Sequence, residues 1–375
     1  MPLISRRALL SGCVAPLLGA AAAAPAPGTA PRSPPREPGL NARALRKDLF
    51  YGAALDTRIL RTDRTYMAQV PVECGFVVGE YSFKWSELRP EPDKYAFDHA
   101  ELLVGYAARH GLRVRGHALV WYQSNPDWLE PMLKPDTGEK LLATHIRTTV
   151  GHFRKRVVHW DVVNEAIEPE DGKPNGLRDT LWLRALGPSY IDTAFHSCAM
   201  ADPHALRVLN DYGMEYALPW QERRRGVMLD LLASLKARNV PIQALGLQAH
   251  LDGSETHLDQ KLVSKFCADV ASLGLKIVIT EMDVRDNGLP ADIAVRDAAI
   301  AAHARAYLDA VLPCPAVLGV VTWGLSDRRS WLDDQMPRAD KLPQRPLPLD
   351  TEMHRKPLWT ALAGALDLAP VRRGS

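Results

Sequence analysis

Two glutamates stand directly after apolar runs of the chain, at places where a buried strand would end. Glu165 follows "WDVVN" and Glu281 follows "IVIT". An unpaired carboxylate is costly to bury, so each needs a chemical reason to be there. A pair of carboxylates can cleave a glycosidic bond, with one as proton donor and the other as nucleophile or general base. Taken singly, either glutamate could instead form an ion pair or cap a helix.

The elements that must position this pair are short apolar runs that alternate with longer helical patterns. The stretches 97–111 and 222–239, for example, have apolar residues at intervals of three and four and end in glycine or asparagine. A strand followed by a helix, repeated eight times, predicts an α/β fold built as a single (β/α)8 TIM barrel. The expected strands cover residues 51–55, 75–80, 113–121, 157–165, 206–212, 243–251, 276–284 and 318–326.

An open, doubly wound sheet is the competing architecture, but no Gly-rich turn of the GxGxxG type follows an early strand. Polar residues at the carboxyl ends of the runs favour the barrel, because those ends converge on one face of it. The two glutamates come from the fourth and seventh runs and should face each other across the barrel mouth. The polar strand-end residues are Glu80, His117, Trp121, Asn164, Glu165, Asn210, Asp211, Gln248, His250, Glu281, Asp283 and Trp323.

The beginning of the chain has the composition of an export signal and a tether. The paired arginines of "SRRALL" precede a Leu/Ala/Val stretch and then small residues, a pattern similar to a twin-arginine signal. We therefore expect a periplasmic or secreted protein. Lipidation at Cys13 is disfavoured because the apolar segment before it is too short. We assign 1–26 to the signal peptide, 27–40 to a Pro-rich disordered linker and 41–375 to the catalytic barrel.

Charge and cysteine content exclude several classes of function. The formal charge of +2 falls to about zero without the paired arginines, which gives no electrostatic case for nucleic acid or an anionic membrane. No later stretch has the roughly 18 uninterrupted apolar residues of a membrane span. The four cysteines after the signal lack metal spacing, so we expect small buried residues, with one bridge of undetermined pairing allowed. These are Cys74, Cys198, Cys267 and Cys314.

Seven short motifs, in their order along the chain, resemble those of glycoside hydrolase family 10, whose typical members are endo-1,4-β-xylanases. The motifs are "FKW", "RGHALVW", "WDVVNEA", "VLNDYG", "GLQAHL", "ITEMDV" and "VTWGLSD". No single tripeptide decides the matter, but the ordered set is specific, and the resemblance covers residues 48–365. It implies a retaining enzyme that hydrolyses internal β-1,4-xylosidic bonds of xylan and xylo-oligosaccharides by double displacement, without metal or organic cofactor.

The resemblance also implies roles for individual residues. It makes Glu165 the general acid/base and Glu281 the nucleophile, with His250 hydrogen-bonded to the nucleophile and Asp283 holding that histidine. Asp283 is two residues from Glu281 and so points to the same side of a strand. Asn164 resembles the asparagine that binds the 2-hydroxyl of the sugar being cleaved. Because adjacent strand residues face opposite ways, Asn164 and Glu165 together require a bend or bulge.

Further residues match positions that bind sugar in the family. Aromatic planes suit the apolar faces of pyranose rings, although an isolated tryptophan would more often be a core residue. Glu80 and Lys84 should contact the sugar one position further toward the nonreducing end, and Gln248 resembles the residue near the acid/base. The expected substrate-binding residues are Glu80, Lys84, His117, Trp121, Gln248, Trp323 and Trp331.

Four positions depart from the family pattern. Tyr81 and Gly213 stand where asparagine is common, Tyr122 where histidine is usual and Leu332 where arginine is often found. These changes bear on the ranking of substrates, because a pocket discriminates a single group by only about 1–3 kcal/mol. A β-1,4-glucanase or aryl-cellobiosidase on the same scaffold, and a non-catalytic glycan-binding protein, therefore remain alternatives. We expect a monomer whose partner is a β-1,4-linked polysaccharide or oligosaccharide.

Overall fold

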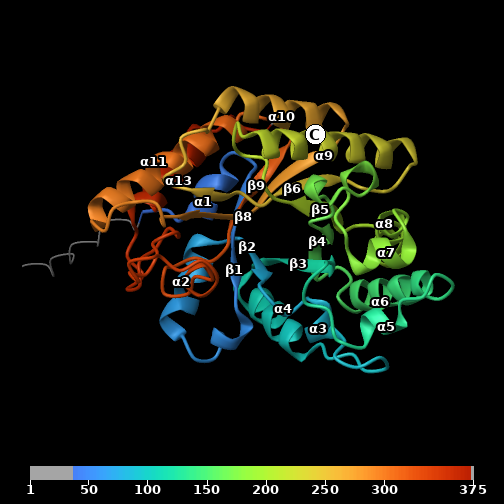
Figure 1. Ribbon diagram of the computed structural model, residues 1–375. Helices are drawn as coiled ribbons and strands as arrows, with labels where there is room; N and C mark the ends of the chain where they lie inside the picture. The colour runs from blue at the N-terminus through green and yellow to red at the C-terminus, as the bar shows by residue number, and fades with distance from the viewer. Residues whose placement is uncertain (1–36, 373–375) are drawn as a thin grey trace, which may run out of the picture. The chain divides into compact units, whose positions relative to one another are not determined.

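A closed sheet of parallel strands forms the centre of the computed structural model, which describes residues 37–372 (Figure 1). The strand order is β6-β5-β4-β3-β2-β1-β9-β8, and pairing of β6 with β8 closes the barrel. A short further strand, β7, pairs with β8. The predicted (β/α)8 barrel is confirmed. The strands are β1 (Phe50–Leu55), β2 (Phe76–Gly79), β3 (Arg113–Val120), β4 (Val157–Asn164), β5 (Leu206–Asp211), β6 (Ala244–Leu247), β7 (His250–Asp252), β8 (Lys276–Arg285) and β9 (Val317–Thr322).

Helices surround the sheet, and several begin and end at residues with a clear local reason (Figure 1). Asp63, Asp259 and Asp292 each accept a backbone N–H at the start of their helix. Gly111 follows α4 with a left-handed φ of 67°. The helices are α1 (Leu40–Leu45), α2 (Arg64–Glu73), α3 (Trp85–Leu88), α4 (Asp98–His110), α5 (Leu129–Met132), α6 (Gly138–His152), α7 (Leu181–Leu186), α8 (Tyr190–Ala201), α9 (Pro219–Ala237), α10 (Gln260–Ser272), α11 (Ile293–Val311), α12 (Leu332–Gln335) and α13 (Pro357–Leu368), with 3₁₀ turns η1 (Thr57–Ile59), η2 (Pro169–Asp171) and η3 (Pro174–Gly176).

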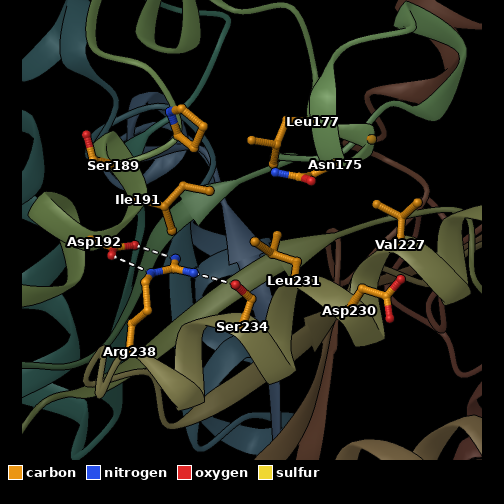
Figure 2. A pocket seen from close by; sticks show the side chains of 12 residues that line it. Asn175, Leu177, Ser189, Ile191, Asp192, Val227, Asp230, Leu231, Ser234 and Arg238 are labelled. Atoms are coloured by element: carbon orange, nitrogen blue, oxygen red, sulfur yellow. Dashed lines mark hydrogen bonds and ion pairs between the residues drawn. The ribbon is translucent and has the colours of Figure 1, made fainter.

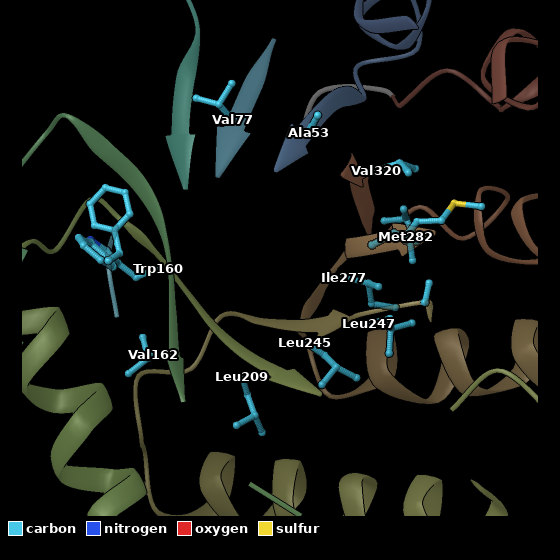
Figure 3. Packing of buried hydrophobic residues seen from close by; sticks show 14 of the residues in the cluster. Ala53, Val77, Trp160, Val162, Leu209, Leu245, Leu247, Ile277, Met282 and Val320 are labelled. Atoms are coloured by element: carbon cyan, nitrogen blue, oxygen red, sulfur yellow. The ribbon is translucent and has the colours of Figure 1, made fainter. Parts of the chain in front are cut away.

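Alternate residues of each strand enter two separate apolar layers. The larger layer lies between the sheet and the helices and includes Ala53, Val77 and Trp160 (Figure 3). The smaller one fills the barrel, where Phe50 and Phe76, the first residues of β1 and β2, stack with ring centroids 4.1 Å apart. The amino end of the barrel is thus closed by side chains, which leaves the carboxyl ends of the strands for polar groups.

This alternation breaks in β8, where Glu281 stands. Ile279 and Met282 both belong to the outer layer, although they are three positions apart and regular alternation would put them on opposite faces. The register against β9 shifts between these two residues. Thr280 and Glu281 therefore both face the barrel interior, as their shared contact with Asn210 shows.

A second irregularity ends β4. Its register against β5 shifts between Asp161 and Val163, and Glu165 takes a left-handed φ of 56°. This turn of the backbone places the side chains of Asn164 and Glu165 on the same side, where they share a hydrogen bond. The bend that the sequence required is confirmed.

The sixth predicted strand is not continuous. The run 243–251 divides into β6 and β7, because Ala249 adopts a left-handed φ of 58°. At the break the backbone of Gln248 donates to Asp211 and accepts from Glu281. The interruption moves Gln248 and His250 toward the barrel axis at the height of the glutamates.

The beginning of the described chain differs from its prediction, and the cysteines within it form no bridge. The predicted signal, 1–26, and most of the predicted linker lie outside the described residues. Leu40, the last predicted linker residue, instead begins α1 and is fully buried. The four cysteines within residues 37–372 are unpaired. No helix in that range is long and apolar enough to span a membrane.

The contact between β3 and the outer layer gives a stability prediction. A methyl group at Gly116 would lie 2.1 Å from the ring of Trp160, which is fully buried. Gly116→Ala should lower the free energy of unfolding by about 3 kcal/mol, the upper end of the usual cost of overpacking. Gly151→Ala in α6, where nothing lies within 4 Å, is the matched control and should be neutral or stabilising. Equal urea midpoints for the two variants would contradict this packing.

Candidate active site

Glu165 and Glu281 meet at the carboxyl end of the barrel, with two amide side chains between them. Asn164 Nδ2 donates to Glu165 Oε1 (3.1 Å), and Asn210 Nδ2 donates both to Asn164 Oδ1 (2.8 Å) and to Glu281 Oε1 (2.6 Å). Both carboxyl groups are largely buried, since Glu165 is 8% and Glu281 5% exposed. They belong to one compartment, as the sequence predicted.

Three N–H groups hold the carboxyl group of Glu165. Asn164 and Gln248 donate to Oε1, the latter at 2.9 Å, and Trp121 Nε1 donates to Oε2 at 2.9 Å. An oxygen of this kind accepts about two hydrogen bonds. Oε1 is therefore saturated, and Oε2 keeps a position at which a proton can sit.

Glu281 has a different environment, which favours its charge. Asn210 donates to Oε1, His250 Nε2 lies 3.3 Å from Oε2, and His117 Nδ1 lies 3.7 Å from Oε1. Burial alone would raise the pKa of Glu281, but the two histidines and the Asn210 amide outweigh it, and the pKa lies below its ordinary value. The two glutamates are thus unequal, as a pair with two roles requires.

A chain of hydrogen bonds extends from Glu281 through the next strand residues. His250 Nδ1 lies 2.9 Å from Asp283 Oδ1, and Asp283 Oδ2 accepts from Trp331 Nε1 at 2.7 Å. Burial opposes the charge of His250, but Asp283 and then Glu281 raise its pKa well above the usual value. Trp331 and His250 also contact each other, with ring centroids 5.1 Å apart.

His117 is held by a buried ionic cluster of Asp161 and Arg115. Its Nδ1 lies 3.1 Å from Asp161 Oδ2, and Arg115 donates to the other Asp161 oxygen at 2.6 Å. Asp161 and Arg115 were not predicted as site residues. A signal was present, because "RVRGH" places charged residues at alternate positions of a buried strand.

Lys84 places a positive charge near both glutamates. Its ammonium nitrogen lies 4.9 Å from the ring centroid of Tyr81 and 4.7 Å from that of Trp121. Burial lowers the pKa of Lys84, while the charges of Glu281, and more weakly Glu165, oppose that effect. The two aromatic rings hold a cation in a buried place where it interacts with both carboxylates.

Glu80 is a further carboxyl group, and it lies close enough to Lys84 for their charges to interact. Burial first, and then the charge of Asp56, raise the pKa of Glu80 to about 7, against the opposing charges of Lys84 and Arg58. Its carboxyl group therefore changes between hydrogen-bond donor and acceptor near neutral pH.

The structure brings the twelve predicted site residues into one network. Trp323 joins it through a ring contact with His117, at 5.1 Å between centroids. Asn210, which sequence reasoning noted at a strand end but gave no role, is the central amide of the site. A cavity of about 610 Å³ on the outer wall, beside α8 and α9, contains none of the twelve residues (Figure 2).

The Asp283–His250 pair gives a pH-dependent stability prediction. His250 binds its proton more tightly in the folded state, so the pair stabilises fully below the unfolded pKa of about 6.5, and this contribution is lost as pH rises through the folded-state pKa. Asp283→Asn should cost about 1.5–3 kcal/mol at about pH 5.5 and distinctly less at about pH 8.5. Trp331→Phe removes the other donor to Asp283 and should show no such dependence. Urea unfolding at both pH values distinguishes them, and a parallel loss in both variants would contradict the pair.

Known proteins are similar to this chain in both sequence and fold. The model of Glycosyl hydrolase family 10 matches residues 39–365. Endo-1,4-beta-xylanase 5 of Pyricularia oryzae is 31% identical over 88% of this chain and 79% of its own length, and Exoglucanase XynX of Acetivibrio thermocellus is 31% identical over 84% and 29%. The chain thus spans under a third of the second relative. Xylanase 10B from Thermotoga petrophila RKU-1, in complex with xylobiose, has a TM-score of 0.81 and 29% identity over 89% of this chain and 99% of that one. The chain belongs to glycosyl hydrolase family 10.

Proposed function

We propose that this chain is a retaining endo-1,4-β-xylanase, with Glu281 as nucleophile and Glu165 as general acid/base. The observation that carries the proposal is the unequal treatment of two buried carboxyl groups in one compartment. Glu281 is surrounded by groups that favour its charge, and Glu165 keeps one oxygen with room for a proton. Family membership, and the xylanase names of similar proteins, support xylan as the substrate.

In the first step, Glu281 attacks the anomeric carbon while Glu165 gives its proton to the glycosidic oxygen, which leaves with the reducing-side chain. A covalent glycosyl-Glu281 ester forms, and Glu165 is left as a carboxylate. In the second step, Glu165 takes a proton from water, whose oxygen displaces Glu281 from the anomeric carbon. Two inversions retain the β configuration. Lys84 interacts with whichever glutamate carries the charge.

Two further contacts support sugar binding in this scheme. Asn164 uses one amide hydrogen on Glu165, so its second can reach the 2-hydroxyl of the sugar being cleaved. Trp323 and Trp331 are partly exposed beside His117 and His250, where aromatic planes can cover pyranose faces. We also propose that the enzyme acts as a monomer. We propose its export to the periplasm or beyond on the strength of the twin-arginine pattern.

The assigned roles predict different losses in two variants. Glu281→Ala should abolish turnover of every substrate. Glu165→Ala should spare the first step on dinitrophenyl xylobioside, whose leaving group needs no acid, and slow the second by about 10²–10⁴-fold. Azide, which attacks without a base, should restore turnover of Glu165→Ala and give the β-azide product. Wild-type rates for Glu165→Ala on xylan would refute the assignment, and an α-anomer as first product by NMR would refute retention.

A relative named exoglucanase makes β-1,4-glucanase activity the second candidate. Xylose and glucose differ by one hydroxymethyl group, and such a difference is worth about 1–3 kcal/mol in a pocket. We expect kcat/KM for nitrophenyl xylobioside to exceed that for nitrophenyl cellobioside by about 10–200-fold. The reverse order would make the enzyme a glucanase. Binding of xylo-oligosaccharides without release of reducing sugar would make it a glycan-binding protein.

A further inference from the structure

Arg178 lies in the loop after β4 and contacts the backbone of Glu165. Its Nε donates to the Glu165 carbonyl oxygen at 3.0 Å, and its own backbone N–H donates to the carbonyl of Ala166 at 2.8 Å. The side chain is buried, with Arg178 9% exposed. No hydrogen bond joins its guanidinium to the Glu165 carboxyl group, and its hydrogen bond to this residue is to the backbone.

Two tyrosine rings enclose this guanidinium. Its carbon lies 4.5 Å from the ring centroid of Tyr122 and 5.7 Å from that of Tyr212. A terminal nitrogen also donates to the Tyr212 hydroxyl at 2.7 Å and to Glu168 Oε2 at 3.3 Å. Tyr122 is one of the positions that depart from the family pattern. In this chain the ring of Tyr122 covers one face of the Arg178 guanidinium.

The backbone of Glu165 needs support of this kind. Its left-handed φ of 56° is unfavourable for a residue with a side chain and persists only where surrounding contacts determine it. Asn210 accepts from its N–H at 2.8 Å, and Arg178 donates to its carbonyl oxygen. Together these contacts hold the peptide groups on both sides of the glutamate.

The segment that follows β3 thus supports Glu165 twice. Trp121 donates to the carboxyl group, and the next residue, Tyr122, packs on the arginine that holds the carbonyl. We propose that Arg178, enclosed by Tyr122 and Tyr212, is the positioning residue of the acid/base, setting the backbone turn that aims the Glu165 carboxyl into the barrel. This inference rests on the proposed role of Glu165.

The test uses substrates that differ only in their need for an acid. Arg178→Met keeps the length and apolar contacts of the side chain but loses the donors. It should lower kcat/KM on xylohexaose by about 10–100-fold, since misplacing a catalytic group by about 1 Å has an effect of this size. On dinitrophenyl xylobioside kcat/KM, which reports the first step, should change by less than about threefold because the leaving group needs little acid assistance. Tyr122→Ala, which removes the ring from the guanidinium, should separate the two substrates in the same sense as Arg178→Met, and Tyr122→Phe, which keeps the ring, should not separate them.

Arg225→Met is the matched control. Arg225 is also a buried arginine, and it donates to the carbonyls of Met214 and Tyr216 rather than to Glu165. Its loss should lower the melting temperature without separating the two substrates. Should Arg178→Met fail to fold, as judged by circular dichroism, Tyr122→Ala gives the same comparison.

The outcomes separate this inference from the proposed function. Equal losses on both substrates in Arg178→Met, or no loss, would overturn the positioning role if Glu165→Ala still distinguishes them. If Glu165→Ala itself does not distinguish the two substrates, the acid/base assignment fails first. If Arg178→Met and Glu165→Ala both lose more activity on xylohexaose than on dinitrophenyl xylobioside, the positioning role and the acid/base assignment are both supported.

Discussion

The burial of two carboxyl groups in one barrel mouth is the constraint on which the rest of the site depends. Each loses hydration, and two charges so close would repel, so the surroundings must treat them differently. Asn164 and Asn210 stand between them and satisfy their oxygens. His117 and His250 lie beside Glu281 and favour its charge. The two carboxyl groups therefore differ through the neighbours that their oxygens meet, because the residue type is the same.

Strand geometry would by itself prevent this arrangement, since successive side chains point to opposite faces. Irregularities near the ends of the relevant strands overcome this: a register shift before Glu281, a left-handed Glu165 and a left-handed Ala249. In each case the apolar residues beside it stay in the outer layer while the polar ones turn inward. The barrel thus keeps its core, and these three departures lie toward its mouth, where the ladder ends and such departures cost least.

The sequence predicted the barrel because strand and helix signals alternate regularly and because polar residues end the strands. It predicted the twelve site residues through motifs, whose spacing is local. It missed what depends on long-range contact. Arg178 acts through a carbonyl oxygen, which leaves no mark in a motif, and Asp161 takes its role from contacts with Arg115 and His117 on the neighbouring strand. The break at Ala249 also carried no signal, since neither glycine nor proline stands there.

Three of the four departures from the family pattern show a related effect, because each of the three has a partner elsewhere in the structure. Tyr122 packs on Arg178, and Tyr81 lies 4.9 Å from the Lys84 ammonium nitrogen. At Gly213, with a φ of 73°, a Cβ atom would lie 2.6 Å from the ring of Trp220, so the absence of a side chain there allows that ring its position. A change that removes an amide from the cleft thus brings an aromatic group beside a cation or against the backbone. Substrate preference in this enzyme should accordingly depend on these pairs rather than on single residues, since replacing one member leaves the other without its contact.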